Sequence, residues 1–161
     1  MTEVHRVLKP DEGQKYILSF AALPQAVNPS LCTMDYLRCF PRRVAPLIDW
    51  LTVMSYNFDS DAAVAAAAYE GAITNIFPNW IEAMGGDATR LTLGTCVDLA
   101  PEQGGGGCAW GPGPSDTIVD RWTTFGKEAG GMMIYAGSSD QDNSKGKYAI
   151  TNRILSGQGK K

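Results

Sequence analysis

The sequence predicts an α/β fold built on a parallel sheet that is covered by helices. Two observations support this prediction. Short, almost continuously apolar segments rich in strand-forming residues lie at 14–23, 49–56, 90–96 and 130–136. Each is followed by a segment of helix-forming composition, so the order of elements is β-α-β-α-β-α-β-α. The 161 residues suffice for one domain and a sizeable core.

The first two predicted strands are 14–23 and 49–56. The first reads QKYILSFAAL and the second contains LTVMS, and both stretches are apolar and prone to form strands. Between them, residues 31–40 are compatible with a helix. Pro41 and Pro46 keep this helix short, because proline lacks the amide donor and clashes inside a helix.

The segment DSDAAVAAAAYEGAITNIF predicts a long helix after the second strand. Asp59, Ser60 or Asp61 is suited to cap its start, and the alanine run has high helix propensity. The small side chains favour close packing against a sheet. Pro78 is expected to end or kink this helix.

The second half of the chain continues the pattern. Its predicted elements are a strand at 90–96, a loop at 97–114, a helix from Ser115 or Asp116 to about Lys127, a strand at 130–136 and a helix at 147–155. Such units occur in doubly wound folds and in the (β/α)8 barrel. No repeat or linker is evident, so 1–161 is predicted to be a single domain with β/α units over 14–155 and flexible ends at 1–13 and 156–161.

The composition excludes several classes of partner. Hydrophobic residues make up 44% and charged residues 19%, which is ordinary for a globular protein. The net charge is −3 and no long basic run occurs, so neither nucleic acid nor an anionic membrane is an expected partner. No apolar run approaches the ~20 residues of a membrane span. The start, MTEVHRVLKPDEGQ, has no signal-peptide pattern, which indicates either a cytosolic protein or a missing true start.

The cysteines do not predict a metal site. They are Cys32, Cys39, Cys96 and Cys108, and none forms a C-x-x-C pair, so zinc is not expected. Cys96 and Cys108 flank a glycine-rich loop and are able to pair in an oxidising compartment. Free buried thiols are the equally open alternative.

Polar and aromatic residues gather at the carboxyl ends of the predicted strands, which is where parallel α/β folds carry their sites. In chain order they are Gln25, then Ser55, Tyr56 and Asn57, then Asp98, and finally Tyr135, Ser138 and Asp140. Aromatic rings stack on sugars, and amides and carboxylates form hydrogen bonds with them. The pattern therefore favours a carbohydrate site at this edge.

The GGGG run at 104–107 does not predict a nucleotide site. A Walker loop needs Lys and then Ser or Thr after its last glycine, whereas Cys108, Ala109 and Trp110 follow here. A mobile loop beside the site is favoured, and no cofactor is expected. Trp110 is then either a sugar platform carried by the loop or a packing residue.

No complete catalytic set is evident. His5 is the single histidine and lies near the end of the chain, which argues against a Ser-His-Asp triad. Paired carboxylates are the usual glycosidase signature. Asp59, Asp98 and Asp140 are candidates by location alone, and Asp59 is more typical of a helix cap.

The stretch LIDWLTVMSYNFDS resembles the sixth-strand motif of glycoside hydrolase family 18, which contains chitinases and endo-β-N-acetylglucosaminidases. That motif reads D-x-x-x-V-M-x-Y-D; Asp49, Val53, Met54 and Tyr56 match it, and Asn57 replaces the final Asp. KYILSFAALP is similar to the fifth strand of the family. RLTLGTCVD is similar to the seventh, usually L-x-L-G-x-P, and AGGMMIYAGSSD to the eighth, usually G-x-M-x-W followed by Asp, with a tyrosine in place of the tryptophan. The resemblance covers about residues 14–155.

The resemblance implies strands 5–8, the C-terminal half, of a (β/α)8 TIM barrel. It also implies retaining, substrate-assisted cleavage of β-1,4-linked N-acetylglucosamine in chitin or the N-glycan core, in which the substrate's acetamido oxygen attacks the anomeric carbon. Tyr56 and Asn57 would be catalytic by positioning this acetamido group, and Tyr135 would stack under the sugar. The other residues expected to bind substrate are Met54, Gln25, Asp98 and Trp110.

The general acid of that family is not found in this sequence. Neither D-x-x-D-x-D-x-E, which ends in the catalytic glutamate, nor the third-strand S-x-G-G occurs in the 161 residues. Since a general acid typically contributes ~10²–10⁴ in rate, we expect the chain alone to be inactive. A half barrel has two bare edges, so we expect a missing N-terminal half, through truncation, or a homodimer. A non-catalytic chitin or N-glycan binder and a structural interaction domain are the alternative functions.

Overall fold

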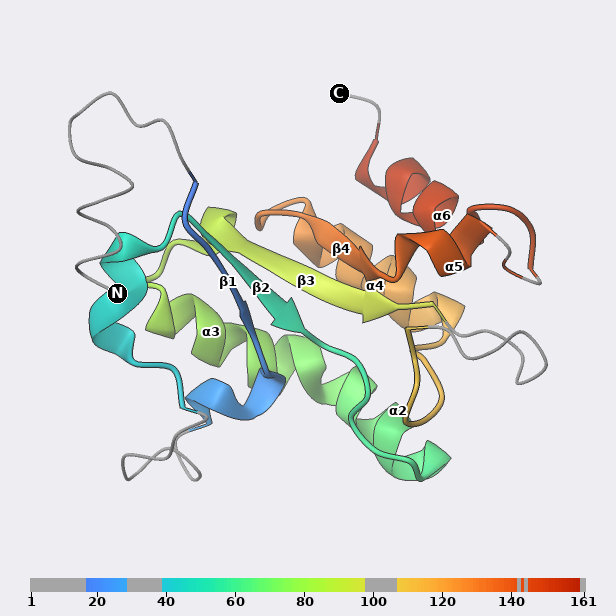
Figure 1. The fold of residues 1–161 in the computed structure, drawn as a ribbon, viewed down its shortest axis with the longest axis horizontal. Helices are drawn as coiled ribbons and strands as arrows, with labels where there is room; N and C mark the ends of the chain where they lie inside the picture. The colour runs from blue at the N-terminus through green and yellow to red at the C-terminus, as the bar shows by residue number, and fades with distance from the viewer. Residues whose placement is uncertain (1–16, 29–38, 98–106, 142, 144, 160–161) are drawn as a thin grey trace.

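The computed structural model describes residues 17–28, 39–97, 107–141, 143 and 145–159. Its centre is one sheet of parallel strands in the order β1-β2-β3-β4 (Figure 1). The strands are β1 Ser19–Ala22, β2 Trp50–Met54, β3 Leu91–Cys96 and β4 Met132–Tyr135. The predicted α/β class and parallel sheet are confirmed, with the strands in chain order.

Helices lie between successive strands, and two more, α5 and α6, follow the last strand. They are the 3-10 helices η1 Pro24–Val27, η2 Arg42–Leu47 and η4 Ala88–Arg90, the π-helical η3 Ala72–Ile76, and the α-helices α2 Ala62–Gly71, α3 Phe77–Ala83, α4 Asp116–Gly126, α5 Gly137–Gln141 and α6 Ala149–Gln158. Helices α2, α3 and α4 lie along one side of the sheet, and α6 packs on α4 near β4 (Figure 1). None of the described helices is long and apolar enough to cross a bilayer.

The core lies between the sheet and these helices. Alternate strand residues, among them Val53 and Leu93, point to the helices and are fully buried beside Trp80 and Trp122. Full burial of an aliphatic side chain of this size contributes about 1.5–3 kcal/mol. Burial of this one face therefore fixes which strand residues point toward the helices and which toward the opposite face.

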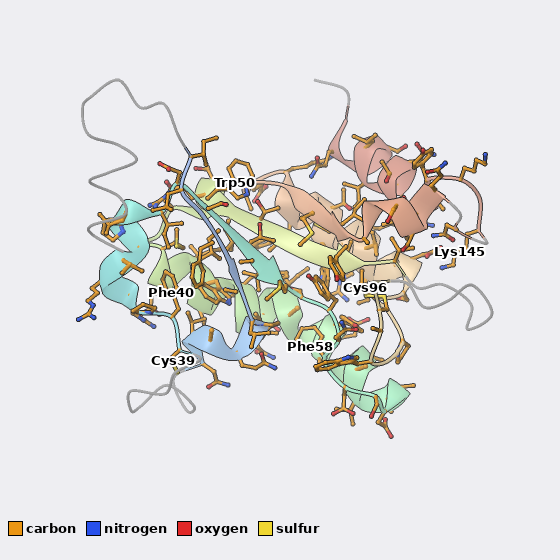
Figure 2. The ribbon with its side chains drawn as sticks, viewed as in Figure 1. Cys39, Phe40, Trp50, Phe58, Cys96 and Lys145 are labelled. Carbon is orange, nitrogen blue, oxygen red and sulfur yellow. A yellow bond between two sulfur atoms is a disulfide. The ribbon has the colours of Figure 1, made fainter. Side chains whose placement is uncertain are left out.

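The opposite face of the sheet is only partly covered. It carries Thr52, Met54 and Met133, which are half-buried, and Trp50, which is 40% exposed. Trp50 lies near the start of β2, at the opposite end of the sheet from Cys96 (Figure 2). Strands β1 and β4 end the strand order, so each has one neighbour in the described sheet.

The long helix predicted after the second strand is interrupted at Pro78 but does not end there. Asp61 caps its start by accepting hydrogen bonds from the N–H groups of Ala63 and Val64. Before Pro78 the backbone widens into the π turn η3, and the N–H of Phe77 donates to the carbonyl of Ala72. Proline then occupies the first turn of α3, where its missing N–H costs little.

Other elements differ more from the prediction. Of the predicted helix 31–40, residues 31–38 lie outside the described part. Pro41 is the N-cap of the 3-10 helix η2, and Pro46 lies inside it. The 3-10 turn η1 and the helix α5 were not expected. Ser115 is confirmed as the cap of α4, since its side chain accepts from the N–H of Ile118.

Candidate functional site

The candidate site lies at the carboxyl edge of the sheet, as expected for parallel strands. Strand β2 ends at Met54 and leads into Tyr56 and Asn57, and β4 ends at Tyr135. Strand β3 runs between them and ends at Cys96 (Figure 2). The sheet therefore brings the ends of three predicted strands to one edge.

Two predicted site residues, Tyr56 and Tyr135, stack on each other. Their ring centroids are 5.3 Å apart and the ring planes differ by 1°. Tyr135 is 50% exposed, so part of its surface is open to a ligand. Since β3 separates β2 from β4, the stacked rings bridge over β3. This stacked tyrosine pair is the centre of the candidate site.

Gly94 of β3 makes room for the tyrosine pair. It pairs in register with Met54 on one side and Met133 on the other. A Cβ at Gly94 would lie 2.7 Å from the carbonyl oxygen of Val53, 3.0 Å from Cε of Met133 and 3.3 Å from Cε1 of Tyr56. A larger side chain would displace the Tyr56 ring. Glycine matched the L-x-L-G pattern in the sequence, but its contact with Tyr56 could not be predicted.

Tyr56 remains a neutral hydrogen-bond donor at physiological pH. Burial raises the pKa of its hydroxyl above the ordinary value, and the adjacent Tyr135 raises it further. Within the described part of the chain, the Tyr56 hydroxyl makes no hydrogen bond. A neutral phenol of this kind donates to carbonyl oxygens such as that of an acetamido group.

Asn57 directs its side chain to a neighbouring loop. Its backbone is left-handed, with φ 56°. The side-chain amide nitrogen donates to the carbonyl of Gly107 at 3.3 Å, and the side-chain oxygen accepts from the N–H of Trp110 at 3.3 Å. One N–H and one lone pair of the amide remain for a ligand. Its predicted role in binding the acetamido group stays a prediction.

Cys96 and Cys108 form a disulfide, which decides between the two alternatives left open by the sequence. Their Cα atoms are 5.2 Å apart. The bond joins the end of β3 to the far side of the glycine-rich loop, and the N–H of Cys108 donates to the carbonyl of Val97 at 3.4 Å. No cysteine in the described residues is free.

The side chain of Trp110 points largely into solvent. It is 74% exposed, so it does not act as a packing residue. Its backbone is nevertheless bound to Asn57, which follows Tyr56 directly. A third aromatic residue is thus anchored through its backbone next to the segment that carries Tyr56.

The other predicted site residues are less involved. Gln25 is exposed on η1, and the neighbouring carbonyl of Pro24 accepts from the indole of Trp80 at 3.1 Å, which ties η1 to α3. Asp98 lies outside the described residues. Asp59 has a local role, since its side chain accepts from the N–H of Asp61 at 2.9 Å.

Asp140 is a structural carboxylate. It is fully buried and accepts hydrogen bonds from the N–H groups of Ile150 and Thr151, from the Thr151 hydroxyl and from the Asn143 amide. Burial raises its pKa, but these four donors outweigh burial and hold the pKa below its usual value. Asp140 therefore accepts hydrogen bonds from N–H groups in the first turn of α6, and it is not available to a substrate.

Within the described residues, no group of three His, Cys, Asp or Glu side chains is placed to hold a metal ion. Comparison with protein families, with curated proteins and with solved structures finds no match to this chain. The candidate function therefore rests on the residues and geometry at the carboxyl edge.

Proposed function

We propose that this chain is a fragment of a chitinase-like glycoside hydrolase, similar to family 18, that binds β-1,4-linked N-acetylglucosamine without cleaving it alone. The observation that carries this proposal is the stacked pair of Tyr56 and Tyr135 at the carboxyl edge of a parallel sheet. Chitin and the N-glycan core both present this sugar.

The chemistry of the pair suits such a sugar. Tyr135 offers a half-exposed ring for the apolar face of a pyranose, and Tyr56 supports that ring from behind. The neutral hydroxyl of Tyr56 donates to the acetamido carbonyl. Trp110 supplies a further exposed ring for a neighbouring sugar unit.

The expected lack of hydrolysis follows from the missing acid motif and from the contacts of the candidate carboxylates. The sequence contains no D-x-x-D-x-D-x-E, and Asp59 and Asp140 are both occupied by backbone N–H groups. Neither of these two is placed to protonate a leaving oxygen. Under this proposal the general acid is supplied by a group other than these two carboxylates.

The half-barrel architecture is part of the same proposal. The proposal is supported by four parallel strands in chain order with helices along one side, as four successive β/α units of a barrel would have. Strands β1 and β4 end the sheet, and the face with Trp50 is partly exposed. Parallel sheets are normally covered on both faces, so we propose that an N-terminal half or a second copy closes the barrel.

Calorimetric titration with a chitin tetramer tests the proposal. We expect saturable binding that Tyr135→Ala weakens about tenfold, since an aromatic contact of this kind contributes about 1–1.5 kcal/mol. Tyr148→Asn is the matched control, because Tyr148 is a similarly exposed tyrosine, at 45%, that takes no part in the stacked pair, and asparagine tolerates its left-handed backbone. No reducing ends should be released.

Other results would change the proposal. If Tyr135→Ala and the unmodified chain bind the chitin tetramer with equal affinity, the tyrosine pair is not part of the binding site. Absence of binding in a cooperatively folded chain would favour the structural interaction domain. Turnover of the tetramer would contradict the expected lack of activity.

A further inference from the structure

We propose that Asn57 and the Cys96–Cys108 disulfide act together as a clamp that positions Trp110 as a second sugar platform. The clamp binds the segment 107–111 to the ends of the strands. In this assignment Asn57 is a positioning residue, not a direct sugar ligand. Its consequence for sugar binding rests on the proposed function, whereas the clamp itself does not.

Asn57 supplies one half of the clamp. Its amide spans the segment, since it donates to the carbonyl of Gly107 and accepts from the N–H of Trp110. These partners are 50 and 53 residues away along the chain, so the contacts are tertiary. The left-handed backbone of Asn57, which asparagine tolerates better than most residues, accompanies this arrangement.

The disulfide supplies the other half from the neighbouring strand. Cys108 lies between the two residues that Asn57 binds and is bonded to Cys96 at the end of β3. Asn57 follows β2, so adjacent strands hold the same segment. The segment is therefore held at residues 107, 108 and 110. A segment held at three points loses little further conformational freedom when a ligand binds.

Two glycines show how closely this segment packs on the strand ends. A Cβ at Gly107 would lie 1.8 Å from the carbonyl oxygen of Tyr135, and one at Gly111 would lie 2.1 Å from that of Asp59. The backbone of the segment is therefore pressed against the residues that follow β2 and end β4. The side chain of Trp110 projects from it, with 74% exposed.

The segment connects the two aromatic parts of the site. Gly107 packs against Tyr135, and Trp110 is bound to the residue that follows Tyr56. A ring held in this way adds to the binding of an oligosaccharide that extends past the tyrosine pair. We expect a single sugar on the tyrosine pair not to contact Trp110, so the clamp should matter for the tetramer and not for the monosaccharide.

Asn57→Gly is the first test, because glycine keeps the left-handed backbone and removes the amide. We expect the ¹⁵N order parameter of the Trp110 backbone N–H to fall from about 0.85 to below about 0.6. The dissociation constant for a chitin tetramer should rise about fivefold, while that for N-acetylglucosamine stays unchanged. Tyr148→Gly is the matched control, since Tyr148 has the same φ of 56° and should leave both quantities unchanged.

The Cys96→Ser/Cys108→Ser double variant tests the contribution of the disulfide to the clamp. A chemical reductant is unsuitable, because Cys39 is also in a disulfide. We expect the same loss of order at Trp110 and the same selective loss of tetramer affinity. If Asn57→Gly does not fold, Asn57→Asp replaces it, since a carboxylate still accepts from Trp110 but cannot donate to Gly107.

The outcomes separate the clamp from the proposed function. Weaker tetramer binding with an unchanged Trp110 order parameter would overturn the clamp and make Asn57 a direct ligand. Lower order with unchanged tetramer affinity would show that Trp110 is not a platform. If the unmodified chain binds no sugar, the proposed function fails, and the order parameters still decide whether the clamp exists.

Discussion

At the scale of single residues, the candidate site is built from contacts between segments that lie far apart in the sequence. Tyr56 and Tyr135 were expected at one edge, because parallel strands end together. The stacking of their rings depends on the strand order and on the space above Gly94, which no local pattern encodes. The amide of Asn57 binds residues more than 49 positions away, so its partners were equally unpredictable.

The first prediction at this scale concerns Gly94. Gly94→Ala should destabilise the fold by about 1–3 kcal/mol, because the new Cβ meets the Val53 carbonyl oxygen at 2.7 Å and the backbone cannot easily move. It should also displace the Tyr56 ring and change the near-ultraviolet circular dichroism of the tyrosine pair. Urea unfolding measures the first effect.

Gly137→Ala is the control for this substitution. Nothing lies within 4 Å of a Cβ at Gly137, and this residue begins the helix α5. Alanine there should be neutral or stabilising by up to about 1 kcal/mol. Equal effects at both glycines would show that the space above β3 is not needed by Tyr56.

At the scale of elements, local rules predicted the regular segments and failed where tertiary contacts replace them. The caps Asp61 and Ser115 were among the predicted residues, because capping is local. Helix α6 begins after Tyr148, which makes no side-chain cap. Its first N–H groups are satisfied by Asp140, ten and eleven residues earlier, and this explains why Asp140 was mistaken for a site candidate.

This cap makes the stability of the fold depend on pH. The donors around Asp140 lower its pKa in the folded state, so between the folded and unfolded pKa values the unfolded chain binds more protons. The stabilisation is complete above the unfolded value of about 3.9 and is lost as the pH falls through the lower folded value. Asp140→Asn should cost about 2–4 kcal/mol at pH 7, and the difference should shrink on acidification.

Urea unfolding from pH 7 to pH 3 checks this behaviour. Asp120→Asn is the control, because Asp120 forms an exposed ion pair with Arg153, which contributes about 0–1 kcal/mol. A difference between Asp140→Asn and the unmodified chain that stays constant at every pH would mean that folding leaves the pKa of Asp140 unchanged.

At the scale of the whole molecule, the order of the sheet could be predicted because each β/α unit places its strand beside the previous one. Whether further strands join these four could not be predicted, since that depends on partners outside the sheet. Edge strands and a partly exposed face that carries Trp50 remain in the described structure. Both features favour association.

We therefore expect the purified chain to self-associate through this face. Trp50→Lys should weaken association at least tenfold, because a charge on an apolar contact is costly to desolvate. Val64→Lys is the control, since Val64 is 52% exposed on α2, on the helix side of the sheet, and should leave the association unchanged. Sedimentation equilibrium over a range of concentrations measures both. A monomer that unfolds cooperatively at every concentration would show that four β/α units are stable without closure, and the partner proposed for the barrel would then be unnecessary.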